Sequence, residues 1–185
     1  TARPFYGQVT GTGFTKAGSG TNSALYLTNA GAANNFTGPV TINQGFVTLL
    51  VVNQITDTAT VVVNAGGGLN LGTFTDTIGG LVLTGATTPA NTVAGTGAAV
   101  LTVNGNVTVN PSAATATIQP PLNLGGAART FDIADGTAAD DLSLPSTCIV
   151  SNGGIIKTGA GQLKLAAVNT YAGGTSINAG TISIA

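Results

Sequence analysis

Residues 153–185 restrict the fold of this chain more than any other stretch, because they alternate short apolar runs with small-residue turns. Gln162 to Leu165 and Thr181 to Ile184 each place an apolar side chain at every second position. This period of two predicts strands with one buried face and one solvated face. The turns between the runs contain glycine, which readily adopts the positive φ angles of sharp turns. The segment is therefore predicted to run strand, turn, strand, turn, with no room for a helix.

A weaker copy of this pattern lies at about residues 14–50, and the stronger copy occupies residues 155–185. Phe14 to Gly20 parallels Ile155 to Gly161, with a lysine followed by a glycine-rich turn in both. The second half of each copy also matches, since an asparagine, an aromatic residue and a closing glycine recur in the same order. The chain thus contains an internal repeat, which is the sequence signature of a solenoid.

The string IIKTGAGQLKLAAVNTYAGGTSINAGTISI resembles the autotransporter-associated β-strand repeat of bacterial surface proteins. It departs from the usual motif at Ala167, where glycine is common, and by apolar exchanges at Ile156 and Ile182. Members of that family fold as right-handed parallel β-helices that are exported to the cell surface, so the resemblance implies this fold and this location, but no activity. The positions that match the motif are Lys157, Thr158, Gly159, Gly161, Leu163, Leu165, Asn169, Thr170, Tyr171, Gly173, Gly174, Thr175, Ile177 and Gly180.

We therefore predict an all-β chain that forms a right-handed parallel β-helix (a β-solenoid) as a single domain over residues 1–185. One coil should take roughly 20 residues. Asn104-Gly105 fits a two-residue hairpin turn, but the dense recurrence of strands and turns around it favours coiling.

The low charge of the chain excludes several functions. Only 6% of the residues are charged and the net charge is −1, so the clustered lysines and arginines that bind nucleic acid are missing. No apolar run approaches the ~18–20 residues of a membrane-spanning helix, so membrane insertion is not expected. Nothing in the sequence points to a cofactor.

Most of the acidic residues gather in one segment, Arg129 to Leu144, which holds Asp132, Asp135, Asp140 and Asp141. Carboxylates in such numbers suit a calcium ion, but their spacing does not fit an EF-hand loop or a glycine-rich calcium repeat. Paired carboxylates also cleave glycosides, yet the chain has no histidine and no tryptophan. We therefore interpret the segment as a solvated, turn-forming stretch, and predict no metal site and no enzymatic activity.

Other conspicuous side chains have structural interpretations. Cys148 lies in an apolar run and is expected to be a small buried hydrophobe. Lys16 and Lys157 occupy equivalent positions of the two copies and are expected to shield turns or strand edges. Asn43 and Asn178, at equivalent turns, are expected to cap a coil or to join an asparagine ladder.

The two ends of the sequence carry the functional hypothesis. A solenoid leaves an unpaired strand edge at each end, and polar caps usually cover these edges. Here neither end shows a capping helix or a charged flank. Two complementary ends make a heterologous contact, which propagates into a filament. We therefore expect a secreted structural subunit that binds itself head to tail, through an assembly interface of Phe5, Tyr6, Val9, Thr181, Ile182 and Ile184.

Two alternatives remain at this stage. The chain could instead be a fragment of an autotransporter passenger or adhesin at the cell surface. It could also be a carbohydrate-binding or carbohydrate-cleaving β-helix, which would need a groove of aromatic and charged side chains. Each hypothesis gives an extracellular or cell-surface location, and the last two leave the cell surface or glycans open as partners.

Overall fold

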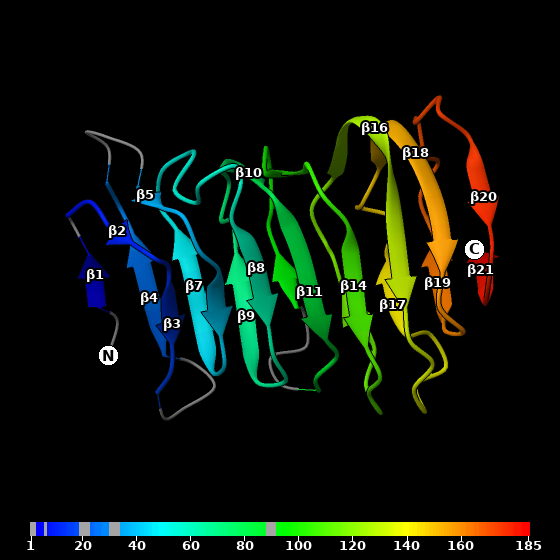
Figure 1. The fold of residues 1–185 in the computed structure, drawn as a ribbon, viewed down its shortest axis with the longest axis horizontal. Coiled ribbons are helices and arrows are strands. Elements are labelled where there is room, and N and C mark those ends of the chain that lie inside the picture. The colour runs from blue at the N-terminus through cyan, green and yellow to red at the C-terminus, as the bar shows by residue number, and fades with distance from the viewer. Residues whose placement is uncertain (1–2, 6, 19–22, 30–33, 88–91) are drawn as a thin grey trace.

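The computed structural model describes residues 3–5, 7–18, 23–29, 34–87 and 92–185. Within these residues the chain is all β, and the strands stack as successive coils along the long axis of a rod, with the N- and C-termini at opposite ends (Figure 1). The described residues contain no helix, and so none that could cross a membrane.

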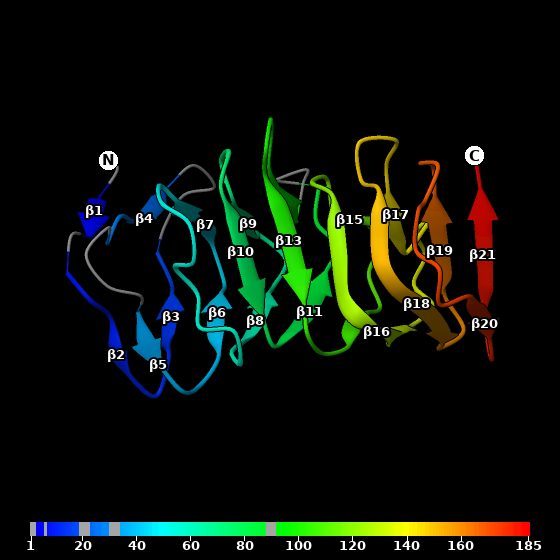
Figure 2. The same ribbon diagram turned by 90° about the horizontal axis from the view of Figure 1, so that it is seen from above.

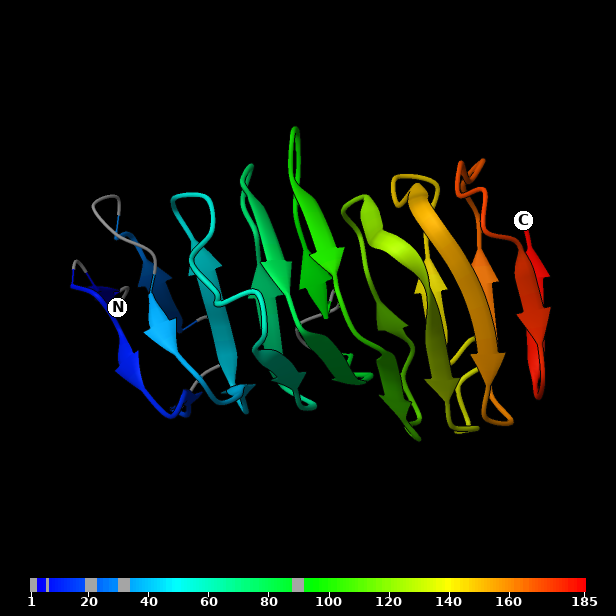
Figure 3. The ribbon, with the colours of Figure 1, turned by 45° about the horizontal axis from the view of Figure 1, so that its top comes forward.

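Each coil runs over three faces of the rod, which are visible as separate layers when the rod is turned (Figures 2 and 3). The first face consists of β1 (Arg3–Phe5), β4 (Ala24–Leu27), β7 (Gly45–Leu49), β9 (Gly67–Asn70) and β12 (Val93–Ala94). A bridge from Val93 to Ile118 continues it into β15 (Ala116–Thr117), β17 (Leu142–Leu144), β19 (Gln162–Leu165) and β21 (Thr181–Ile184).

The other two faces share a corner in the C-terminal half. The second face holds β2 (Thr10–Gly11), β5 (Asn35–Phe36), β10 (Thr75–Ile78) and β13 (Val100–Val103). The third face holds β3 (Phe14–Lys16), β6 (Val40–Ile42), β8 (Thr60–Val63), β11 (Gly80–Thr84), β14 (Val107–Asn110) and β20 (Thr175–Ile177). Two long strands, β16 (Leu122–Ile133) and β18 (Val150–Thr158), turn from the second face onto the third, and β16 pairs with both β13 and β14.

Every strand pair is parallel, and the pairing register fixes the length of a coil. Leu25 pairs with Val47, and Val47 pairs with Leu69, so two successive coils have the same length there. The coil from Thr117 to its partner Ser143 is longer, and the coil from Leu163 to its partner Ile182 is shorter. The lengths therefore vary around the roughly 20 residues per coil that a solenoid of this kind predicts.

The core is a set of apolar ladders that run along the rod axis. On the third face Val40, Val61, Leu81, Val107 and Phe131 follow one another in register, and none of them is exposed. Each buried aliphatic or aromatic side chain of this kind contributes about 1.5–3 kcal/mol. Since neighbours in a ladder come from successive coils, each coil buries apolar residues against the coil before and the coil after it.

The structure confirms the parallel β-solenoid, while its right-handed sense stays a prediction. Asn104-Gly105 does not form a hairpin, because β13 and β14 pair with strands of other coils. The segment from Arg129 to Leu144 is only partly a turn, since β16 continues through Ile133 and β17 begins at Leu142. The apolar alternation within RTFDI, with Phe131 and Ile133 buried, explains this strand.

Substitution of Gly45, at the closing turn of the N-terminal repeat, tests how closely the coils are packed. Gly45 has φ +68°, and a Cβ there would collide with the carbonyl oxygen of Ser23 in the preceding coil. Gly97 has φ +60°, and its Cβ would meet nothing closer than Thr73 Cγ2 at 3.6 Å. We expect Gly97→Ala to lower the free energy of unfolding by about 1 kcal/mol through backbone strain alone. Gly45→Ala adds the collision and should cost about 3 kcal/mol.

Urea unfolding followed by circular dichroism measures both changes. Equal losses in the two variants would show that the coils are not in contact at Gly45.

Candidate assembly site

Five of the six residues of the predicted assembly interface lie in the first and last coils, whose strands β1 and β21 stand at opposite ends of the rod (Figure 2). Phe5 belongs to β1, where its backbone pairs with Leu27. Tyr6 lies outside the described residues. Thr181, Ile182 and Ile184 belong to β21 at the other end. One chain therefore does not bring the two groups together, and only a contact between chains could do so.

Val9 is already engaged within its own chain. Its side chain is half-buried and packs against the core. Its N–H donates to Asn34 Oδ1 at 2.8 Å, and its carbonyl oxygen accepts from the N–H of Asn35 at 2.9 Å. Val9 thus joins the first coil to the second, and its backbone groups are not free for another chain.

The last strand presents an open edge and an uncovered apolar residue. Ile182 pairs with Leu163 and packs against the core, whereas Ile184 is 84% exposed although its ladder partner Leu165 is 4% exposed. The N–H groups of Thr181 and Ala185 donate to Gly161 and Leu165. Backbone groups alternate between the two sides of a strand. The N–H and C=O of Ile182 and Ile184 therefore face away from β19.

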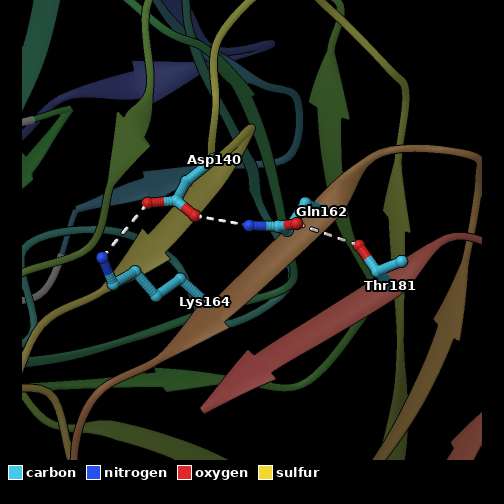
Figure 4. Close-up of polar contacts among 4 residues, drawn as sticks. All are labelled: Asp140, Gln162, Lys164 and Thr181. Atoms are coloured by element: carbon cyan, nitrogen blue, oxygen red, sulfur yellow. Dashed lines mark hydrogen bonds and ion pairs between the residues drawn. The ribbon is translucent and has the colours of Figure 1, made fainter. Parts of the chain in front are cut away.

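Polar side chains connect the last three strands of the first face on its outer side (Figure 4). Asp140, just before β17, accepts from Gln162 Nε2 at 2.7 Å and pairs with Lys164 Nζ at 3.3 Å. Gln162 Oε1 in turn accepts from the hydroxyl of Thr181 at 3.2 Å. This chain of contacts holds β21 to β19 and β19 to the turn before β17, so the terminal strand is fastened despite its open edge.

The opposite edge, formed by β1, carries a proline. The carbonyl oxygens of Ser23 and Leu27 accept from N–H groups in and just after β7. The backbone groups of the odd-numbered residues of β4 therefore point toward β7, and those of Tyr26 point toward β1. Pro4 is the partner of Tyr26, and in a parallel ladder its backbone nitrogen then points away from β4. Proline has no N–H, so a strand added to this edge would lack one hydrogen bond.

The lysine of each repeat copy is a contact between coils. Lys157 is completely buried, and its Nζ donates to the carbonyl oxygens of Thr158 at 2.6 Å, Gly159 at 2.8 Å and Ala179 at 3.3 Å. Burial lowers the pKa of this amine, and the charges of Asp132 and Asp141 oppose the shift.

Lys16 repeats the contact in the N-terminal copy. Its Nζ donates to the carbonyl oxygen of Gln44, the counterpart of Ala179, and to Ser23 Oγ, both at 3.0 Å. The expectation that these lysines shield turns or strand edges and bind nothing is wrong, because each lysine binds a carbonyl oxygen of the following coil's turn and Lys157 is buried.

An asparagine of the repeat makes a second contact between coils. Asn34 Oδ1 accepts from the N–H of Val9, and Asn169 Oδ1 accepts from the N–H of Val150, each at 2.8 Å. The two asparagines stand at equivalent positions in the two copies. In both copies the amide therefore binds the backbone of the preceding coil at the second face, where the chain itself forms little strand.

The acidic residues of the charged segment serve the same purpose. Asp141 Oδ1 accepts from the N–H of Gly136, and its Oδ2 accepts from the N–H of Gln162 in the next coil, both at 2.8 Å. Asp132 Oδ1 accepts from the hydroxyl of Thr158 at 3.0 Å. In the part of the chain that the structure describes, no group of three or more acidic, histidine or cysteine side chains is placed to hold a metal ion.

Cys148 and Asn43 occupy the places expected of them, whereas Asn178 does not join a ladder. Cys148 is fully buried, and burial raises the pKa of its thiol to about 12. Asn43 accepts from Asn64 Nδ2 at 2.7 Å, which is the expected asparagine ladder, whereas Asn178 accepts from Ser176 within its own turn at 2.9 Å. The thiol is thus a core residue, and the asparagines order the turns.

A shallow surface depression crosses the third face, but it differs from a sugar-binding groove. It is lined by three glycines, by threonines and asparagines, by Leu81 and Val82, and by one acid, Asp57. It contains no aromatic side chain on which a sugar ring could stack.

The sequence-based interpretation missed the buried polar residues between coils. Asn34 and Asn169 were recognisable only as matching positions of the repeat, and Asp141 was counted with the solvated acids. Asp76 gave no signal at all, because it lies outside both repeat copies in an ordinary strand pattern, yet it is 1% exposed.

Two segments of the chain, residues 14–51 and residues 155–184, match the family model described as the passenger-associated-transport-repeat. The chain carries two passenger-associated-transport repeats. This confirms the resemblance drawn from the sequence, and repeats of this kind on a β-solenoid fit a passenger-type protein of the autotransporter class. No curated protein and no solved structure matches the chain.

The buried lysine of the C-terminal repeat can be compared with an exposed one. We expect Lys157→Met to lower the free energy of unfolding by about 2–4 kcal/mol, because it removes the donor from three carbonyl oxygens inside the protein. Lys164→Met breaks only the half-exposed ion pair with Asp140 and should change stability by less than about 1 kcal/mol. Urea unfolding at neutral pH compares the two variants. Losses of unfolding free energy of similar size would contradict the role of Lys157 as a contact between coils.

Proposed function

We propose that the chain is a structural segment of a secreted, cell-surface passenger. Its role is to form a rigid rod rather than to catalyse a reaction. One observation carries this proposal. The distinctive side chains of the transport repeat, Lys157 and Asn169 in one copy and Lys16 and Asn34 in the other, all bind the backbone of a neighbouring coil. The residues that define the repeat are therefore used for stacking.

The surface of the rod supports the same role. Five successive outward positions of the third face are small β-branched side chains in a single file, which Asp132 and Thr158 continue: Thr15, Thr41, Val62, Val82 and Thr108. Such side chains suit a pleated sheet surface and carry no acid or base for catalysis.

Electron microscopy and glycan arrays of the purified chain test the structural role. We expect elongated particles and no specific glycan binding. Saturable binding of one glycan class, or release of sugars from a polysaccharide, would overturn the proposal in favour of a carbohydrate-active β-helix.

Head-to-tail assembly into a filament is the second candidate, and the exposure of Ile184 favours it. A further coil stacked on β21 would cover Ile184, just as β21 covers Leu165 of β19. Strand β1 of a second copy belongs to the same face as β21 and could supply that coil. Against this contact, Pro4 leaves one hydrogen bond unmade at the edge of β1. The apolar cover over Ile182 and Ile184 would have to compensate for it.

A pair of aspartate substitutions tests the filament. Ile184→Asp puts a charge on the end face, where it would be buried by a stacked copy, and should abolish filaments. Ile149→Asp puts the same charge on the side of the rod, at a residue that is 41% exposed, and should leave them intact. Negative-stain microscopy over a concentration series provides the measurement. Separate short rods of the unaltered chain at every concentration would exclude head-to-tail assembly and leave the passenger role standing.

A further inference from the structure

Asp76 is an acid in the interior of the rod, at a position where the next three coils carry aliphatic residues. It lies in β10 and pairs with Leu101, which is followed in register by Leu122 and Val150. All four residues of this ladder are at most 1% exposed. A carboxyl group therefore occupies the first place of an apolar ladder on the second face.

The reason for a carboxyl group lies in the preceding coil. Between β7 and β8 the chain forms no strand on the second face. Asp76 Oδ2 instead accepts from the N–H of Gln54 at 2.8 Å and from the N–H of Ile55 at 3.1 Å. The side chain replaces the backbone hydrogen bonds that a strand would have supplied, as Asn34 and Asn169 do elsewhere with a neutral amide.

The other carboxylate oxygen has no partner. Asp76 Oδ1 is buried and accepts no hydrogen bond from any described residue. The charged group near it is Asp57, which is exposed in the turn of the preceding coil and has the same sign. On the other side, β13 and β16 contribute Leu101 and Leu122. Neither the acid Asp57 nor these leucines stabilise a negative charge on Asp76, so the ionised form of its carboxyl group is the less stable one.

We propose that Asp76 is a proton-sensitive fastening between two coils, closed while the carboxyl is protonated and loosened when it ionises. Burial raises the pKa of this carboxyl from 3.8 to about 7, with a smaller contribution from the charge of Asp57, and the backbone N–H groups of Gln54, Ile55 and Thr77 oppose the shift without cancelling it. When the contact opens, water reaches the carboxyl and its pKa returns to about 4. The bound proton thus favours the closed contact.

The direction of the pH dependence follows from these values. The stabilisation by the proton is complete below about pH 4, decreases as the pH rises, and is lost above about pH 7. Residues 50–58, which depend on this contact, should therefore open more readily in neutral and alkaline solution than in mildly acidic solution. The inference does not depend on the function proposed above.

Two measurements on the unaltered chain test this fastening. The ¹³Cγ signal of Asp76 should titrate with a midpoint near pH 7. Hydrogen exchange, corrected for the intrinsic pH dependence of amide exchange, should show the opening of the Gln54 and Ile55 amides increasing about tenfold between pH 6 and pH 8. The amide of Leu163, several coils away, serves as the internal control and should not change. A ¹³Cγ midpoint near pH 4 would overturn the proposal, even if no variant folds.

Two variants sharpen the test. Asp76→Asn keeps an oxygen for the two N–H groups but cannot ionise, so the opening of Gln54 and Ile55 should become independent of pH. Asp57→Asn removes the neighbouring charge but not the titrating group, so it should keep the pH dependence and move its midpoint slightly lower. The same tenfold change in Asp76→Asn would show that another group is responsible and would overturn the proposal.

Discussion

The rod depends on one interaction, the parallel pairing of each coil with the coil before it. Every strand pair joins residues about one coil apart, and Leu25, Val47 and Leu69 show how one ladder passes through successive coils. The same register that aligns the hydrogen bonds also aligns the apolar side chains. A shift by one residue would turn the buried face of a strand to the solvent, so hydrogen bonding and burial enforce a single register together.

Where a coil turns a corner or lacks a strand, the ladders do not supply all of its backbone hydrogen bonds. Where the chain leaves a strand, backbone N–H and C=O groups become buried without a backbone partner, which is costly. Lys157 binds such carbonyl oxygens, Asn34 and Asn169 bind N–H groups, and Asp141 binds N–H groups of two coils. These polar residues inside the protein are therefore part of the stack.

Asp76 shows how such a contact can acquire a second property. Asn34 and Asp76 both serve the backbone of a preceding coil, but the amide is neutral at every pH and the carboxyl is not. With one oxygen left without a partner, the acid makes its coil contact conditional on a proton. A rod with uniform coils would have no such position, so the irregular coil between β7 and β8 is what creates it.

The sequence by itself determined the strands, the turns and the repeat. The alternation in Gln162 to Leu165 and Thr181 to Ile184 predicted the strands, because period-two burial and glycine turns are local properties, and the internal repeat predicted the solenoid. The tertiary structure alone decided which polar residues lie inside. Lys157 looked like a surface lysine and Asp141 like a solvated acid, because their burial depends on carbonyl and N–H groups that come from other coils. Asp76 could not have been found from the sequence, since its partners at Gln54 and Ile55 become neighbours only when one coil is stacked on the next.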